Sequence, residues 1–308
     1  METKQLLTNF VNSRDNKGKI IAAFGYGSGV FKQTGYKLQD KPMIDTIFVV
    51  DNPHLWHQEN IKKNPSDYSS SGRITLKYFD INSIKKATGV TYQSNISFEG
   101  HTFKYGIIGK QKFMDSLNGN WENFFIQGRF QKPIYTIKST GYIDKAIEEN
   151  REYALLVALL TLNKEKPTIL DLYHQICSLS YTGDIRMLFA ENPHKVNNIV
   201  NGSFEQFLEI YGIDTPYFYA KENGELVINY DLLYGSISLL PDTLYEYLNK
   251  CGYSIKNPQR IAELINKKMS QINRRDSIIQ PLTGIVTVGP FASLSYLNQK
   301  MKKKTMNK

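Results

Sequence analysis

Cysteine is scarce in this chain of 308 residues, which contains only Cys177 and Cys251. The two lie far apart and neither has a neighbour at metal-ligand spacing, so neither a disulfide framework nor a zinc finger is expected. This usage fits a reducing compartment. Cys177 follows Thr168 and Asp171, which are spaced as a helix capping box. We therefore expect its thiol to pack in the core and not to act as a nucleophile.

Targeting segments and long unbroken apolar runs are also missing. The N-terminal residues have neither the apolar core of a signal peptide nor the Arg-rich pattern of a transit peptide. Residues 277–299 are free of charge, but they contain Pro281, Pro290 and several Ser, Thr and Gln residues, so a membrane-spanning helix is not expected. Two alternatives remain for this stretch: short strands and turns packed on the body of the protein, or a surface that lies on a membrane.

Positive charge is concentrated at one end of the chain. Residues 250–308 hold twelve of the 38 Lys and Arg but only two of the 29 Asp and Glu, so they carry all of the net charge of +9. Five apolar residues recur there at helical spacing: Ile261, Leu264, Ile265, Met269 and Ile272. The pattern predicts a basic amphipathic helix. Each cation near an anionic surface contributes about 1 kcal/mol, so this end could hold the protein at a membrane reversibly. A solvated tail and nucleic-acid binding are the alternatives.

Two apolar runs flank a glycine-rich turn near the N-terminus. Residues 20–24 and 44–50 are rich in β-branched and aromatic side chains and predict buried strands. Gly27 and Ser28 follow the first strand, where glycine lets the backbone approach phosphate oxygens closely. Asp45 lies on the second strand, 17 residues after Ser28, in a position suited to Mg²⁺. The combination is typical of the DNA polymerase beta-like nucleotidyltransferase superfamily and predicts a site for a metal-bound triphosphate.

One carboxylate of that superfamily pattern is missing. The partner acid normally stands two residues after the first, where this chain has Ile47. Asp51 does not replace it, because six residues of strand span about 20 Å, whereas metal-binding carboxylates lie within a few ångströms of shared ions. We therefore expect the second metal ligand to come from elsewhere. A non-catalytic protein with this fold, acting as a membrane-associated scaffold, remains an alternative.

The residues after the second strand predict a helix with a polar face. Four of them lie near helical spacing: His57, Asn60, Asn64 and Tyr68. Since no further histidine clusters with His54 and His57, we expect surface or hydrogen-bonding roles for these imidazoles in preference to zinc binding. Residues 89–96 and 103–108 read as two further strands, which we expect in the sheet that carries Asp45.

These motifs belong to a longer resemblance. The chain resembles the mitochondrial translocator assembly and maintenance family of CDP-diacylglycerol synthases (phosphatidate cytidylyltransferases) of the inner membrane. The likeness covers almost the whole chain, in residues 26–33 (YGSGVFKQ), 43–50 (MIDTIFVV), 104–107 (KYGI), 128–133 (GRFQKP), 180–187 (SYTGDIRM), 195–200 (KVNNIV) and 284–289 (GIVTVG), and in Trp56, His57, Asn60, Asn64, Tyr68 and Ser69. The leader of mitochondrial members is not visible, which suggests a bacterial relative or a processed form.

The resemblance implies a fold and a location. The fold is α/β: a DNA polymerase beta-like nucleotidyltransferase domain at residues 1–138, then a helical, winged-helix-like domain at 139–249. A basic C-terminal segment at 250–308 would associate with the membrane. The protein would be a peripheral membrane protein, on the cytoplasmic face of a bacterial membrane or on the matrix face of the mitochondrial inner membrane.

The resemblance also implies the reaction, in which CTP and phosphatidic acid give CDP-diacylglycerol and pyrophosphate by Mg²⁺-dependent in-line transfer. Asp45 would hold the metal, Gly27 and Ser28 the β- and γ-phosphates, and Lys104 would act with Asp45 and Ser28 in catalysis. Further residues of the matching segments are candidates for binding CTP: Arg129, Lys132, Asp184, Arg186 and Lys195. For Lys104, Arg129 and Lys132, the alternative is a solvated surface position or a structural ion pair. Asp184 and Arg186 could instead cap a helix and pair with each other.

The lipid site and the partners are less constrained. Residues 277–296, together with the helix before them, are the candidate path for lipid from the membrane to the site. Transfer to RNA or to a protein is a second reading, since the Gly-Ser and Asp pattern is shared. A nucleic-acid partner is not expected, because the charge gathers in one tail and no RNA-binding fingerprint is present. These patterns do not determine the oligomeric state.

Overall fold

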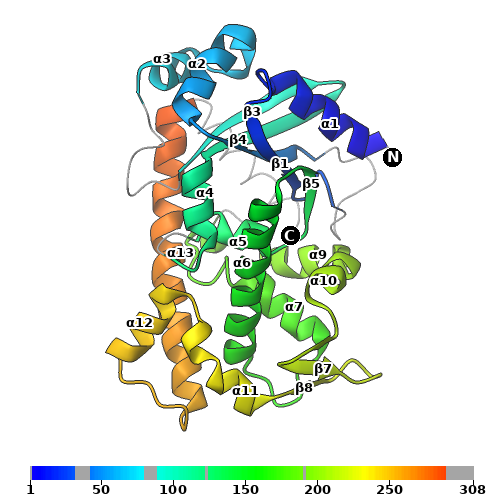
Figure 1. Cartoon of the computed structure of the whole chain (residues 1–308), viewed down its shortest axis with the longest axis vertical. Helices are drawn as coiled ribbons and strands as arrows, with labels where there is room; N and C mark the ends of the chain where they lie inside the picture. The colour runs from blue at the N-terminus through cyan, green and yellow to red at the C-terminus, as the bar shows by residue number, and fades with distance from the viewer. Residues whose placement is uncertain (1, 32–41, 80–88, 122–123, 190–191, 289–308) are drawn as a thin grey trace.

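The chain folds into an α/β part and a helical part. A computed structural model describes residues 2–31, 42–79, 89–121, 124–189 and 192–288. The α/β part is built on a five-stranded sheet, and the helical part lies at the other end of the molecule (Figure 1). The predicted order, an α/β domain followed by a helical one, is confirmed.

The sheet has the strand order β3-β4-β2-β1-β5. β2 and β4 run parallel, and the other neighbouring pairs are antiparallel. The strands are β1 (Ile20–Tyr26), β2 (Ile44–Val50), β3 (Val90–Phe98), β4 (His101–Gly109) and β5 (Ile134–Lys138). The four strands predicted from apolar patterning are all present in one sheet with Asp45, as expected.

Alternation along β2 divides the sheet into two faces. Ile44, Phe48 and Val50 pack with α1 (Glu2–Arg14) and with Trp56 of α2 (Pro53–Lys63). Ile47 and Val49 point to the other face, which is covered by helices that follow later in the chain. Those helices are α4 (Lys110–Leu117), α5 (Gln127–Phe130) and α6 (Gly141–Thr161). Because successive strand residues face opposite sides, Asp45 lies on the face of α4, α5 and α6.

A buried polar network joins α1, α2 and the sheet on the first face. Arg14 donates two hydrogen bonds to Asp67, from Nε at 3.1 Å and from Nη2 at 3.0 Å. Tyr105 of β4 donates to the same carboxylate at 3.0 Å. The predicted polar face of α2 completes the network: Asn60 donates to the hydroxyls of Tyr68 and Tyr105, Asn64 donates to Asn60, and the two nitrogens of His57 contact Tyr68 and Thr91. The prediction of a hydrogen-bonding role for His57 is confirmed.

The helical part has its own core, which includes the fully buried Cys177, as expected. The capping box of Thr168 and Asp171 is present at the start of α7. Small elements complete this part and the connections: η1 (Pro65–Asp67), α3 (Ser70–Tyr78), α7 (Ile169–Ser178), α8 (Arg186–Phe189), α9 (Lys195–Gly202), α10 (Phe204–Tyr211), β6 (Asp214–Thr215), β7 (Phe218–Ala220), β8 (Leu226–Ile228), α11 (Tyr230–Gly235), η3 (Ile237–Leu239) and α12 (Asp242–Lys250).

Two long helices connect the parts. α6 contributes Ile143 and Ile147 to the core beneath the sheet and its second half to the helical core. α13 (Pro258–Val288) contacts α6 and α12 along one half and α3 and β3 along the other. Figure 1 shows it running along most of the molecule. Its predicted apolar face, Ile261 to Ile272, is buried in the helical core, so the protein itself covers that face.

The helix α13 corrects one expectation. Residues 277–288 continue the helix, whereas short strands and turns were the alternative for packing on the body. Pro281 was the reason for expecting a break, because proline removes a backbone hydrogen bond and costs about 3 kcal/mol inside a helix. α13 contacts α3 and β3, and tertiary packing of this kind can outweigh the local preference of a proline. Residues 289–299 lie outside the described part.

In the described part of the chain, none of the helices combines the length and the apolar character needed to cross a bilayer.

Candidate active site

The turn after β1 lies directly against the carboxylate of Asp45. Gly27 has a φ of +77°, and its carbonyl accepts hydrogen bonds from Val30 (3.1 Å) and Phe31 (2.9 Å). A Cβ on Gly27 would stand 3.4 Å from Asp45 Oδ2. A Cβ on Gly29 would meet the carbonyl oxygen of Met43 at 2.4 Å. Glycine is therefore required both for the left-handed conformation and for the close approach of the turn to β2. Ser28 lies between these two glycines.

Strand register places a lysine beside the aspartate. Asp45 pairs with Tyr26 of β1 on one side and with Lys104 of β4 on the other. Lys104 Nζ is 3.6 Å from Asp45 Oδ1, and both side chains are partly exposed. Lys104 Nζ also lies 4.3 Å from the centre of the Tyr92 ring. The site therefore opens to solvent at the carboxyl end of β1, with one carboxylate and one ammonium group side by side.

Arg129 of α5 is half-buried behind this pair. Its guanidinium carbon lies 3.7 Å from the ring centre of Phe125 and 5.5 Å from that of Tyr26, and Nη1 donates to the Phe125 carbonyl at 2.6 Å. Burial alone would lower the pKa of Arg129, but the phenols of Tyr92 and Tyr26 and the carboxylate of Asp45 raise it. The guanidinium therefore stays charged. Its Nε is buried and has no hydrogen-bond partner within the described residues.

Lys132 extends the positive charge toward the helical part. Its Nζ donates to Ser180 Oγ at 2.6 Å and lies 5.3 Å from the ring centre of Tyr181. Burial lowers the pKa of Lys132 to about 8, and the charges of Arg129 and Lys195 act in the same direction. At neutral pH the ammonium group is charged but poorly solvated. An anion placed next to such a group stabilises its charged form.

Lys195 and the segment around Ser180 bring the helical part to the site. Lys195 is the first residue of α9, and its charge is one of those that lower the pKa of Lys132. A Cβ on Gly128 would stand 2.4 Å from Ser180 Cβ, so α5 packs tightly against this segment. Lys132 of one matching segment thus lies against Ser180 and Tyr181 of another, so residues 128–133 and 180–187 meet in the structure.

Asp184 and Arg186 form an ion pair with each other. The guanidinium of Arg186 donates from Nε and Nη2 to the carboxylate of Asp184, with the shortest contact at 2.6 Å, and the Arg186 backbone also donates to it. Both charges affect the pKa of Asp276 of α13, which Arg186 lowers and Asp184 raises. This arrangement matches the alternative in which the two residues pair and cap locally.

Asp45 suits Mg²⁺ as a protein ligand. Mg²⁺ commonly keeps several waters and is bound by one or two carboxylates together with substrate phosphates, and the partly exposed Asp45 beside the Gly27 turn provides such a carboxylate. Ile47 is fully buried in the apolar core, and Asp51 pairs with Lys110 at 3.3 Å beyond the far end of β2. No group of three or more His, Cys, Asp or Glu side chains at metal-binding separation occurs within the described residues.

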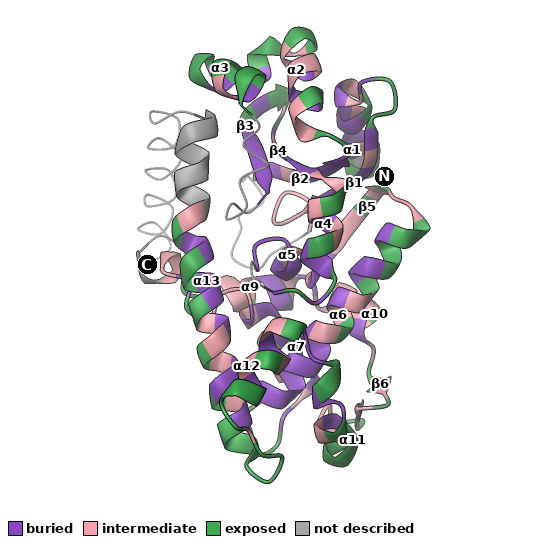
Figure 2. Ribbon diagram, turned by 60° about the vertical axis from the view of Figure 1, so that its left-hand side comes forward, coloured by how far each residue is buried: buried purple, intermediate pink, exposed green. Residues whose placement is uncertain are grey.

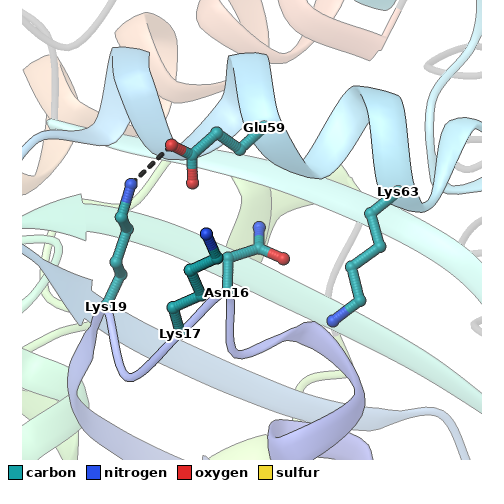
Figure 3. A pocket seen from close by; sticks show the side chains of 5 residues that line it. All are labelled: Asn16, Lys17, Lys19, Glu59 and Lys63. Atoms are coloured by element: carbon teal, nitrogen blue, oxygen red, sulfur yellow. Dashed lines mark hydrogen bonds and ion pairs between the residues drawn. The ribbon is translucent and has the colours of Figure 1, made fainter.

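A surface hollow at the opposite end of β1 is a separate feature. It is lined by Asn16, Lys17, Lys19, Glu59 and Lys63 (Figure 3). Glu59 already pairs with Lys19, and the neighbouring lysines lower the pKa of Glu59. The hollow lies beside Ile20, whereas the Gly27 turn follows Tyr26, so a whole strand separates it from Asp45. It therefore takes no part in the candidate site.

Comparison with known proteins identifies the family. Residues 7–225 match the model of the family described as phosphatidate cytidylyltransferase, mitochondrial. The chain belongs to this family. A relative of the same description from Schizosaccharomyces pombe is 34% identical over 100% of this chain and 85% of its own length. Two further relatives carry the same description. The one from Saccharomyces cerevisiae is 35% identical over 89% of this chain and 64% of its own length, and the one from Rattus norvegicus is 31% identical over 92% of this chain and 90% of its own.

The resemblance read from the sequence is thereby confirmed for the family. A solved nucleotidyltransferase-like protein from Exiguobacterium sibiricum aligns with 98% of this chain and 89% of its own, at 10% identity and a TM-score of 0.29. The family assignment rests on the sequence comparisons.

Sequence reasoning missed three aromatic residues around the site: Tyr26, Tyr92 and Phe125. Tyr92 lies inside the third predicted strand, whereas Tyr26 lies two residues beyond the predicted end of the first strand and ends the observed β1. Their contact with cations depends on the order of the strands, which the sequence pattern did not give. Ser180 was also not singled out, although it begins a matching segment.

Proposed function

We propose that this protein is a phosphatidate cytidylyltransferase that converts CTP and phosphatidate to CDP-diacylglycerol and pyrophosphate. The observation that carries the proposal is the Gly27 turn held against Asp45, with Lys104 in register beside it. A triphosphate placed on this turn would have its charged oxygens within reach of a carboxylate-bound cation and an ammonium group. Family membership supplies the nucleotide and the lipid acceptor.

The reaction would proceed in one displacement. A phosphate oxygen of phosphatidate attacks the α-phosphorus of CTP, the new P–O–P bond forms, and the bond to the β-phosphate breaks opposite the attacking oxygen. Pyrophosphate leaves with the bonding electrons. Such chemistry depends on positioning and charge neutralisation, so the absence of an assigned nucleophile among the site residues is consistent with it.

Each side chain has a proposed task. Asp45 holds Mg²⁺, which when bound neutralises charge on the triphosphate. The backbone of Gly27 and Ser28 contacts the β- and γ-phosphates, and Lys104 stabilises charge near the α-phosphorus. Arg129, Lys132 and Lys195 form the continuation of positive charge toward the helical part, where two anionic substrates must lie together. Asp184 and Arg186 are proposed to support the segment that carries Ser180.

The domain limits and the location belong to the same proposal. Residues 1–138 form the nucleotidyltransferase domain, 139–249 the helical domain, and 250–308 the basic end. We place the enzyme on a membrane surface as a peripheral protein, because phosphatidate resides in the bilayer. The relatives are described as mitochondrial.

Transfer of labelled CMP tests the function. Purified protein is incubated with Mg²⁺, CTP labelled at the α-phosphate and phosphatidate in mixed micelles, with an Asp45→Asn variant as the control. We expect label in the organic phase and an equal amount of released pyrophosphate, both dependent on Asp45. If label enters RNA or protein in parallel reactions, the acceptor is that macromolecule and not the lipid. No transfer to any acceptor would favour a scaffold.

A further inference from the structure

The helix α3 and the adjoining turn of α2 form a surface that is unusually apolar for its exposure. Four large hydrophobic side chains on residues 55–79 are more than half exposed: Leu55 (53%), Ile74 (61%), Tyr78 (66%) and Phe79 (63%). Ile74 and Tyr78 are four residues apart and therefore share one face of α3. Figure 2 shows α3 largely in the colour of exposed residues at one end of the molecule. We call these residues, with Arg73 and Lys77, the α3 patch.

The α3 patch is also purely cationic. Arg73 and Lys77 are exposed and four residues apart, and no Asp or Glu occurs between residues 68 and 79. The buried side of α3 is formed by Gly72 and Leu76, so the apolar residues of the patch are not needed for the core. The Gln58 side chain donates a hydrogen bond to the Lys77 carbonyl at 2.9 Å and so fixes α2, the helix that carries Leu55, against α3.

We infer that the α3 patch docks on an anionic lipid bilayer. Aromatic and aliphatic side chains at the level of the lipid headgroups, with lysine and arginine extended toward phosphates, are the chemistry of interfacial helices. A solvent-exposed helix with this composition and no acidic residue complements a surface that is both apolar and negatively charged. A protein partner with an acidic, apolar surface is the competing occupant.

The position of the patch favours the bilayer. α13 contacts both α3 and β3, the strand that carries Tyr92 of the candidate site. The α3 patch is therefore linked through one helix to a strand that lines the candidate site. The inference rests on the proposed function in one respect, namely that the proposed acceptor is a membrane lipid.

Co-sedimentation with vesicles tests the inference on the full chain without CTP. The vesicles contain phosphatidylcholine alone or phosphatidylcholine with phosphatidylglycerol. We expect Ile74→Ser/Tyr78→Ser/Phe79→Ser to lower binding to anionic vesicles by at least about tenfold, and Arg73→Gln/Lys77→Gln to lower it by about fivefold for each cation. A matched control, Tyr219→Ser/Leu239→Ser/Ile255→Ser, removes three side chains that are 50–57% exposed from the helical part and should bind like the wild type.

Tryptophan fluorescence gives a second readout at the patch itself. The two native tryptophans, Trp56 and Trp121, are fully buried, so their emission gives a constant background. We expect the emission of Tyr78→Trp to shift to the blue on anionic vesicles, while that of Tyr219→Trp stays unchanged. Circular dichroism and thermal unfolding confirm that each variant is folded. Unaltered vesicle binding by the folded α3 variants, or no shift for Tyr78→Trp in bound protein, would overturn the inference and point to a protein partner.

Turnover separates this inference from the proposed function. With short-chain phosphatidate dissolved as monomers, the α3 variants should transfer CMP at the wild-type rate. With phosphatidate in bilayers they should lose activity in proportion to vesicle binding. If the wild type transfers CMP to neither form, the proposed function fails, while the vesicle experiments still decide whether α3 docks.

Discussion

At the scale of single residues, the site depends on one carboxylate surrounded by cations. Asp45 contacts Lys104 at 3.6 Å, and Arg129 lies behind the pair among aromatic rings. The position of the partner acid is occupied by a buried isoleucine, so in the proposed mechanism Asp45 holds the cation together with substrate phosphates. Substitution at Asp45 should therefore affect the reaction far more than the fold.

We expect Asp45→Asn to lower kcat by about 10² to 10³-fold, the usual loss when a main electrostatic group is removed. The side chain is 26% exposed, so the melting temperature should change little. Asp51→Asn is the matched control, because Asp51 follows the same strand, is 74% exposed and pairs only with Lys110 among the described residues. Equal activity of the two variants in the CMP-transfer assay would contradict the assignment of the metal to Asp45.

Lys132 should give the reaction a high-pH limit. Its pKa is lowered to about 8 by burial, so the free enzyme loses this positive charge as the pH rises through 8. We expect kcat/KM to fall above that pH in the wild type. In Lys132→Arg the charge persists, and the limit should disappear from the pH profile. Lys138→Arg, at an exposed lysine, should keep the wild-type profile; an unchanged high-pH limit in Lys132→Arg would show that another group causes it.

At the scale of elements, the turn after β1 and the neighbouring strands together hold the site residues in position. The turn after β1 approaches β2 because Gly29 carries no side chain, and it adopts its conformation because Gly27 tolerates a positive φ. On the opposite face of the sheet, the buried network holds Tyr105 and Thr91, the immediate neighbours of Lys104 and Tyr92. The polar network therefore fixes the strands whose next residues face the site.

Gly27→Ala tests the turn, with Gly18→Ala as the matched control. Both glycines have a φ near +77°, so an alanine at either position costs about 1 to 2 kcal/mol of stability. Only at Gly27 does the new Cβ meet Asp45, at 3.4 Å, whereas nothing lies within 4 Å at Gly18. We expect similar losses of melting temperature but a fall in kcat/KM for CTP only in Gly27→Ala. A comparable fall in both variants would mean that strain, not contact with Asp45, controls activity.

At the scale of the whole molecule, α13 joins the two parts through a buried carboxylate. Asp276 accepts a hydrogen bond from the backbone of Phe124 at 2.6 Å, next to the segment that leads into α5 and Arg129. Burial raises the pKa of Asp276 to about 6. The protonated form is thus favoured in the folded state, and the carboxyl group must ionise in a poorly solvated place at neutral pH.

The sign of this shift predicts a stability profile. A folded-state pKa above the unfolded value of 3.8 gives a stabilising contribution that is complete below pH 3.8 and is lost as the pH rises through about 6. The loss amounts to at most about 3 kcal/mol. In Asp276→Asn, which keeps an acceptor oxygen, the free energy of unfolding should lack this decline between pH 4 and 6.5. Glu263→Gln, on the exposed side of α13, should retain it; a decline that also persists in Asp276→Asn would assign it to another group.

The sequence by itself determined the local parts of this protein. Apolar runs predicted β1 and β2, the Thr168 and Asp171 spacing predicted the capping box, and helical periodicity predicted the face of α13 that is buried. These features depend on neighbours within a few residues, so periodicity and propensity contain them. The positions of Gly27, Ser28 and Asp45 on a turn and a strand were determined in the same way.

Only the tertiary structure decided which of these parts meet. The register that sets Lys104 beside Asp45, the packing of Arg129 between Tyr26 and Phe125, and the continuation of α13 past residue 277 all depend on contacts between distant segments. Strand order cannot be deduced from a pattern that is local to each strand. Likewise, the chemistry of Pro281 predicts a break, whereas the helix that contains it continues to Val288 and contacts α3 and β3.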